Sequence, residues 1–202
     1  MLASAALFAV IAAGGEAGWE YTGPVVTAVA LLLFAAGRLA PGFMRPFFPL
    51  SAPVFWLGLV LLPLAALFSG SLRIEVFSAP WWRALFSGLL ALGYIGLSYA
   101  ARPYWRRQVE QEGKPAGRLK RFIGNHMHRA LFLPFFLSLG LFFVLSARGP
   151  VLTSLLIIES FTIFSLGILL KEESFRPFAY GLLLVSLGRL ILFDMAESDT
   201  LE

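Results

Sequence analysis

The sequence contains no cysteine and few charged or titratable side chains. The absence of cysteine excludes disulfide bonds, thiolate metal sites, iron–sulfur ligation and cysteine nucleophiles. Asp, Glu, Lys and Arg make up 14% of the 202 residues, against about 25% in a soluble domain. Only two histidines are present. The side chains on which most catalytic sites depend are therefore scarce in this chain.

The motifs of several enzyme classes are also missing. The sequence has no HExxH zinc motif, no GxSxG elbow, no P-loop and no GxGxxG. The first aspartate is Asp194, so the paired aspartates of prenyl and phosphoalcohol transferases cannot be assembled in the preceding spans. These absences predict a protein that is not an enzyme, and none of its residues requires a metal or another cofactor.

Apolar residues take the place of the missing charge. They make up 58% of the chain, and the mean hydropathy is +0.80. A soluble protein of this size would lack the polar surface to cover them, so we expect a lipid bilayer to surround most of the chain. The net charge of +4 is then explained by basic residues on the cytoplasmic side of a membrane, and no nucleic-acid partner is expected.

Apolar runs near 20 residues long match the thickness of a hydrocarbon core. They predict an all-α fold, a polytopic transmembrane helical bundle that forms a single domain over residues 1–202. The first run is short and interrupted by Gly14, Gly15 and Glu16. No basic residue precedes it, so it is read as a span and not as a cleavable signal peptide. The expected spans are about 2–18, 23–39, 47–69, 81–101, 128–147, 150–170 and 177–196.

One polar segment, 102–127, separates the fourth and fifth expected spans. Seven of its residues are basic and two are acidic, which places it in the cytoplasm by the positive-inside rule. Alternation then places the N-terminus in the cytoplasm and the acidic C-terminal tail outside. This pattern is typical of a bacterial inner membrane protein.

Two opposite charges fall inside expected spans, Glu159 in the sixth and Arg189 in the seventh. The short polar link 171–176 predicts that these spans pack as an antiparallel hairpin. Counted from the centre of that link, near 173–174, the two residues lie within roughly 2 Å of the same depth. Because a charge within a membrane needs a partner, we expect an intramembrane ion pair. It is either a structural clamp or part of a proton or ion relay.

Four further residues are candidates for polar contacts or ligation. Asp194 and Arg148 both fall near the outer surface and form a candidate polar pair. His126 and His128 stand at the inner end of the fifth span, two residues apart and therefore on different helix faces. Either one is a candidate single axial ligand for a haem or chlorophyll. The alternative is a pair of interfacial histidines beside Arg129.

The last third of the chain, about residues 150–202, contains three distinctive runs: LLIIESFTIFSLGILL, SFRPFAYGLLLVSLG and RLILFDMAESDTL. In these runs it resembles the bacterial membrane-protein family catalogued as domain of unknown function 2339. The resemblance implies a helical membrane architecture and no particular activity. Members of that family are usually far longer, and in them one more span follows the run that ends in aspartate.

Two functions are consistent with these observations. The first is a non-catalytic subunit or scaffold of a larger membrane complex, because the chain has long spans and little chemistry. Its partners would be the lipid bilayer and other membrane-protein subunits. The alternative is a small transporter or flippase with a polar path near Glu159 and Arg189, which would need a water-accessible cavity at Glu159.

Overall fold

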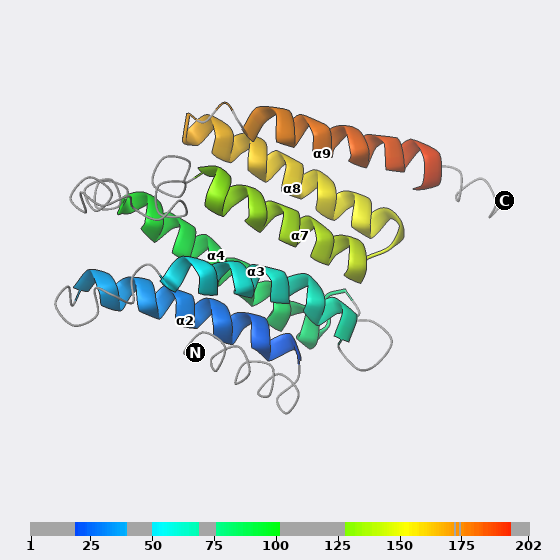
Figure 1. Cartoon of the computed structure of the whole chain (residues 1–202). Coiled ribbons are helices and arrows are strands. Elements are labelled where there is room, and N and C mark those ends of the chain that lie inside the picture. The colour runs from blue at the N-terminus through cyan, green and yellow to red at the C-terminus, as the bar shows by residue number, and fades with distance from the viewer. Residues whose placement is uncertain are drawn as a thin grey trace. The chain divides into compact units, whose positions relative to one another are not determined.

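The structure is a computed structural model that describes residues 19–39, 50–68, 76–101, 128–171, 173 and 175–194. Within these residues every regular element is helical (Figure 1). The helices are α2 (Trp19–Leu39), α3 (Ser51–Phe68), α4 (Ala79–Ala100), α7 (Leu133–Ser146), α8 (Gly149–Leu169) and α9 (Phe175–Arg189), with π-helical turns η2 (His128–Phe132) and η3 (Leu190–Asp194).

The all-helical prediction is confirmed for the described part of the chain. Six of the seven expected spans coincide with helices to within a few residues, and the first, 2–18, lies outside the described residues. Three helical segments are long and apolar enough to cross a membrane: Ala79–Ala100, Gly149–Leu169 and Phe175–Leu192. Three others are apolar but shorter: Tyr21–Gly37, Ser51–Leu67 and Ala130–Ser146. A bundle with seven spans therefore stays a prediction.

The chain divides into two compact units, Met1–Leu139 and Gly140–Glu202. The boundary falls inside α7, so this helix contributes its first half to the N-terminal unit and its second half to the C-terminal unit. The single domain over residues 1–202 that the sequence predicted stays a prediction.

In the N-terminal unit, α2 packs against both α3 and α4. The buried ring of Tyr94 stacks on Phe55 with centroids 4.4 Å apart, and its hydroxyl lies 3.0 Å from Ser51 Oγ. Gly58 brings α3 close to α2, since a Cβ there would lie 2.5 Å from Thr27 Oγ1. Small residues at such contacts let helix backbones approach closely, as is common in membrane proteins.

Two prolines connect α3 to the η2–α7 segment through the carbonyls that they leave free. Pro63 has no N–H for the carbonyl of Leu59 four residues earlier, and Ser138 Oγ donates to that carbonyl. In the same way, Pro134 has no N–H to donate to the carbonyl of Ala130. That carbonyl accepts a hydrogen bond of 2.8 Å from Trp56 Nε1. Each helix therefore donates a side-chain hydrogen bond to a carbonyl that a proline has freed on the other.

In the C-terminal unit, a tight turn links α7 to α8. Only Ala147 and Arg148 lie between the two helices. Gly149 opens α8 with a φ of +54°, a left-handed conformation that glycine adopts without steric cost. Pro150 follows in the first turn, where the missing N–H is not needed.

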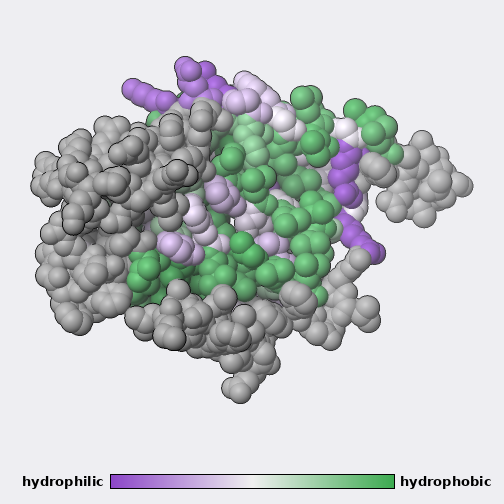
Figure 2. All heavy atoms as spheres, viewed as in Figure 1, coloured by the Kyte–Doolittle hydropathy of each residue, from purple (hydrophilic) through white to green (hydrophobic). Residues whose placement is uncertain are grey.

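On the face drawn in Figure 2, the surface of the described residues is largely apolar. Leu169, Leu184 and Leu192 expose about 70% of their area. Hydrophilic residues gather near the link between α8 and α9, where Lys171, Glu173 and Arg176 are exposed. Exposed apolar area of this extent marks a surface that meets lipid or protein in place of water.

Candidate functional site

The helices α8 and α9 form the predicted antiparallel hairpin, and one hydrogen bond defines its register. Ser160 Oγ donates to the carbonyl oxygen of Ala179 over 2.8 Å, and the rings of Phe164 and Tyr180 pack with centroids 5.7 Å apart. Because Ser160 pairs with Ala179 in an antiparallel hairpin, Phe175 at the start of α9 lies beside Phe164. Phe164 is about five residues before the end of α8 at Leu169. Figure 1 shows α9 starting alongside the last turns of α8.

Glu159 lies at the midpoint of α8, in the interior of a candidate membrane span. Its side chain is 3% exposed. Neither carboxylate oxygen has a hydrogen-bond partner within the described part of the chain. A buried charge without partners is among the most expensive arrangements in a protein interior.

Gly140 of α7 makes the space that the Glu159 carboxyl group occupies. A Cβ on Gly140 would lie 3.1 Å from Oε2 and 3.5 Å from Oε1 of that carboxyl group. Gly140 was not among the site residues predicted from the sequence. The available signal was its position, since a glycine in the middle of an apolar helix lowers the helix propensity.

The predicted ion pair between Glu159 and Arg189 is not formed, which corrects the sequence analysis. Arg189 Nε donates to Thr153 Oγ1 over 3.1 Å, and Nη2 donates to the carbonyl oxygen of Gly149 over 3.5 Å. These partners belong to the first two turns of α8. Gly149 precedes Glu159 by ten residues, which corresponds to about 15 Å along the helix axis.

The register of the hairpin explains the difference. The prediction placed the centre of the hairpin in the middle of the polar link, near 173–174. The observed contacts place it near 170, because α9 begins beside the last turns of α8. Arg189 therefore lies at the far end of the hairpin, where an arginine is cheaper to accommodate than at the centre of a span.

The other predicted site residues stay untested. Arg148 is exposed just before α8. Asp194 ends η3, which contacts α8, but its side chain lies outside the described residues, as does that of His128. His126 falls in the undescribed stretch 102–127. The Asp194–Arg148 pair and the axial-ligand role of either histidine remain predictions.

Metal coordination finds no support among the residues that the structure describes. No group of three His, Asp or Glu side chains comes together there. The hydroxyl of Ser160, next to Glu159, is used by Ala179, and that of Thr153 accepts from Arg189. A lone carboxyl group can bind a proton but offers too few ligands for a divalent cation.

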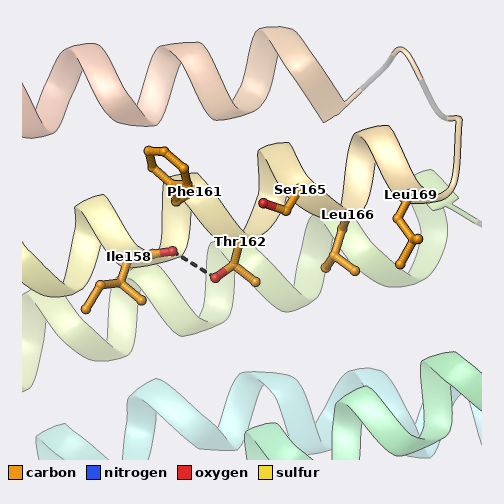
Figure 3. A pocket seen from close by; sticks show the side chains of 6 residues that line it. All are labelled: Ile158, Phe161, Thr162, Ser165, Leu166 and Leu169. Carbon is orange, nitrogen blue, oxygen red and sulfur yellow. Dashed lines mark hydrogen bonds between the residues drawn. The ribbon is translucent and has the colours of Figure 1, made fainter.

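A second feature that the sequence analysis did not identify is a shallow groove of about 420 Å³ on one face of α8 (Figure 3). Thr162 and Ser165 place hydroxyl groups in it among apolar side chains. Thr162 Oγ1 donates to the carbonyl oxygen of Ile158 over 2.8 Å. The spacing of the groove residues along the sequence was the available signal, because it matches one helix face. The residues that line it are Ile158, Phe161, Thr162, Ser165, Leu166 and Leu169.

No family model, no curated protein and no solved structure matches the chain.

Proposed function

We propose that the chain is a non-catalytic subunit or scaffold of a larger membrane complex. The observation that supports this best is the groove on α8, a candidate span whose outward face carries the hydroxyl groups of Thr162 and Ser165. Serine and threonine are enriched where transmembrane helices contact one another.

In contrast to the face of α8 that carries hydroxyl groups, α9 exposes apolar side chains that include Leu184, Val185 and Leu192. These residues suit contact with lipid tails. The contrast between α8 and α9 favours a protein partner at the α8 groove and lipid at α9.

Photo-crosslinking tests the proposal, with a photoreactive residue at Ser165 and a matched control at Leu184. We expect the Ser165 variant to form an adduct with another membrane protein and the Leu184 variant to form adducts with lipid. Lipid adducts alone at both positions, or a crosslink from Ser165 to the N-terminal half of the same chain, would contradict the proposal. A monodisperse monomer in mild detergent, with no partner by mass spectrometry, would also count against it.

One observation favours the alternative function, a small transporter or flippase. Glu159 is a carboxyl group in mid-span without a hydrogen-bond partner among the described residues. Its 3% exposure shows a closed site, whereas a transport path needs water to reach it. A Glu159→Cys variant distinguishes the two functions, because the chain has no other cysteine. Modification by a membrane-impermeant thiol reagent would support transport, and complete protection would remove it.

We further propose a location in a bacterial inner membrane, with the basic segment 102–127 in the cytoplasm and the acidic tail outside. The support is the asymmetry of basic residues in the sequence. We also retain, as a proposal, the relationship of residues 150–202 to the family domain of unknown function 2339. It rests on the sequence runs around Glu159, Gly181 and Asp194.

A further inference from the structure

We propose that Glu159 is an intramembrane proton-binding site, occupied by a proton while α7 and α8 are packed together. The carboxyl group of Glu159 lies at the midpoint of α8. It is 3% exposed, and neither oxygen has a hydrogen-bond partner in the described residues. An ionised carboxylate without water or partners is strongly unfavourable, and binding a proton removes the charge.

The helices around Glu159 offer no compensating cation within the residues that the structure describes. Glu159 is the only titratable residue of α8, and α7 contains none. The described titratable residues of α9 are Arg176, Tyr180 and Arg189. Arg176 and Tyr180 are exposed, and Arg189 donates to Thr153 and Gly149 near the start of α8. The charge of Glu159 is therefore balanced most simply by its own proton.

The surroundings favour a proton over a metal cation. Calcium and magnesium ions need several oxygen ligands, and no group of three acidic or histidine side chains occurs in the described residues. The hydroxyl of Ser160 already donates to Ala179. A proton needs no oxygen beyond the carboxyl group that holds it.

Gly140 links the proton to helix packing. Because it has no side chain, the Glu159 carboxyl group lies directly against α7, where a Cβ would approach Oε2 to 3.1 Å. A neutral carboxylic acid is compatible with such a contact. Loss of the proton would put a charge into the α7–α8 contact, so proton release and separation of the two helices are coupled. The site does not depend on the partner proposed for the α8 groove.

Infrared difference spectroscopy in lipid nanodiscs at pH 7 tests the proposal. Subtracting the spectrum of Glu159→Gln from that of the unmodified protein is expected to show the carbonyl stretch of one protonated carboxylic acid. The matched control is Glu173→Gln, since Glu173 is exposed in the link between α8 and α9. That variant is expected to lose carboxylate bands only. Loss of carboxylate bands in Glu159→Gln would overturn the proposal.

A second measurement needs no variant and so does not depend on how Glu159→Gln folds. A hydrophobic carbodiimide reacts with protonated carboxyl groups inside membranes, and mass spectrometry locates the product. We expect modification of Glu159 at pH 7 that decreases as the pH is raised. Modification confined to exposed carboxyl groups such as Glu173, at every pH, would overturn the proposal. Neither outcome bears on the proposed partner at α8, which is tested by crosslinking.

Discussion

At the scale of single residues, the contact between Gly140 and Glu159 is the most informative in the C-terminal unit. A side chain without hydrogen-bond partners among the described residues lies against a residue that has no side chain. The two positions are 19 residues apart in sequence, and the pairing depends on how α7 and α8 face each other. The missing side chain of Gly140 therefore makes room for the Glu159 carboxyl group, and adding a side chain at position 140 should displace that group.

Replacing Gly140 with alanine should destabilise the protein by about 1–3 kcal/mol, the usual cost of overpacking. The new Cβ would lie 3.1 Å from Glu159 Oε2, so the carboxyl group must move. Gly181→Ala is the matched control, because nothing lies within 4 Å of a Cβ there. Thermal unfolding in detergent measures both variants. Equal midpoints for the two would show that the Gly140 contact is absent.

At the scale of elements, α3 and the η2–α7 segment are joined by two hydrogen bonds that depend on prolines. Proline in a helix normally weakens it by removing a donor. Here the freed carbonyls of Leu59 and Ala130 are used by Ser138 and Trp56. The interruption of each helix thus becomes a specific contact between them.

A double-mutant cycle at Pro63 and Ser138 tests this relationship. Ser138→Ala leaves the buried carbonyl of Leu59 without a donor, which should cost about 1–3 kcal/mol. Pro63→Ala restores a backbone N–H four residues after Leu59, so in that background the cost of Ser138→Ala should fall below about 1 kcal/mol. The free energy of unfolding of the four proteins gives the coupling. Additive effects would mean that Pro63 and Ser138 do not share the carbonyl.

The register of the α8–α9 hairpin is a second property of elements. Ser160 pairs with Ala179, and Arg189 reaches Thr153. Glu159 and Arg189 are therefore separated along the hairpin, although they carry the opposite charges that suggested a pair.

The separation predicts that Glu159→Gln and Arg189→Met act independently. The free-energy change of the double variant should equal the sum of the single changes to within about 0.5 kcal/mol. Unfolding in a denaturing detergent, compared across the four proteins, measures it. A coupling above about 1 kcal/mol would place the two side chains in contact and restore the ion pair that the sequence suggested.

At the scale of the whole molecule, the proposed orientation follows from the distribution of basic residues. Segment 102–127 carries seven of the 16 Lys and Arg residues, and the acidic residues Asp194, Glu197, Asp199 and Glu202 lie near the other end of the chain. The absence of cysteine makes this orientation simple to test, because any single introduced thiol is unambiguous.

Single-cysteine variants Ala116→Cys and Ser198→Cys should differ in their access to a membrane-impermeant thiol reagent. In intact bacterial cells we expect labelling of Ser198→Cys only, because the tail is proposed to lie outside. After cell disruption both variants should react. Labelling of Ala116→Cys in intact cells would place the basic segment outside and reverse the orientation.

The sequence by itself determined the helical class and six helical segments, because long apolar runs bounded by Gly, Pro and charged residues are local signals. It also identified Glu159 and Arg189 as the two opposite charges inside expected spans. It did not determine which residues meet. The tertiary structure decided the register of α8 on α9 and the space at Gly140. It also decided the two hydrogen bonds that α3 and the η2–α7 segment donate to each other's carbonyl groups. The physical reason is that these contacts depend on the offset and rotation of whole helices, which small packing interactions far apart in the sequence decide together.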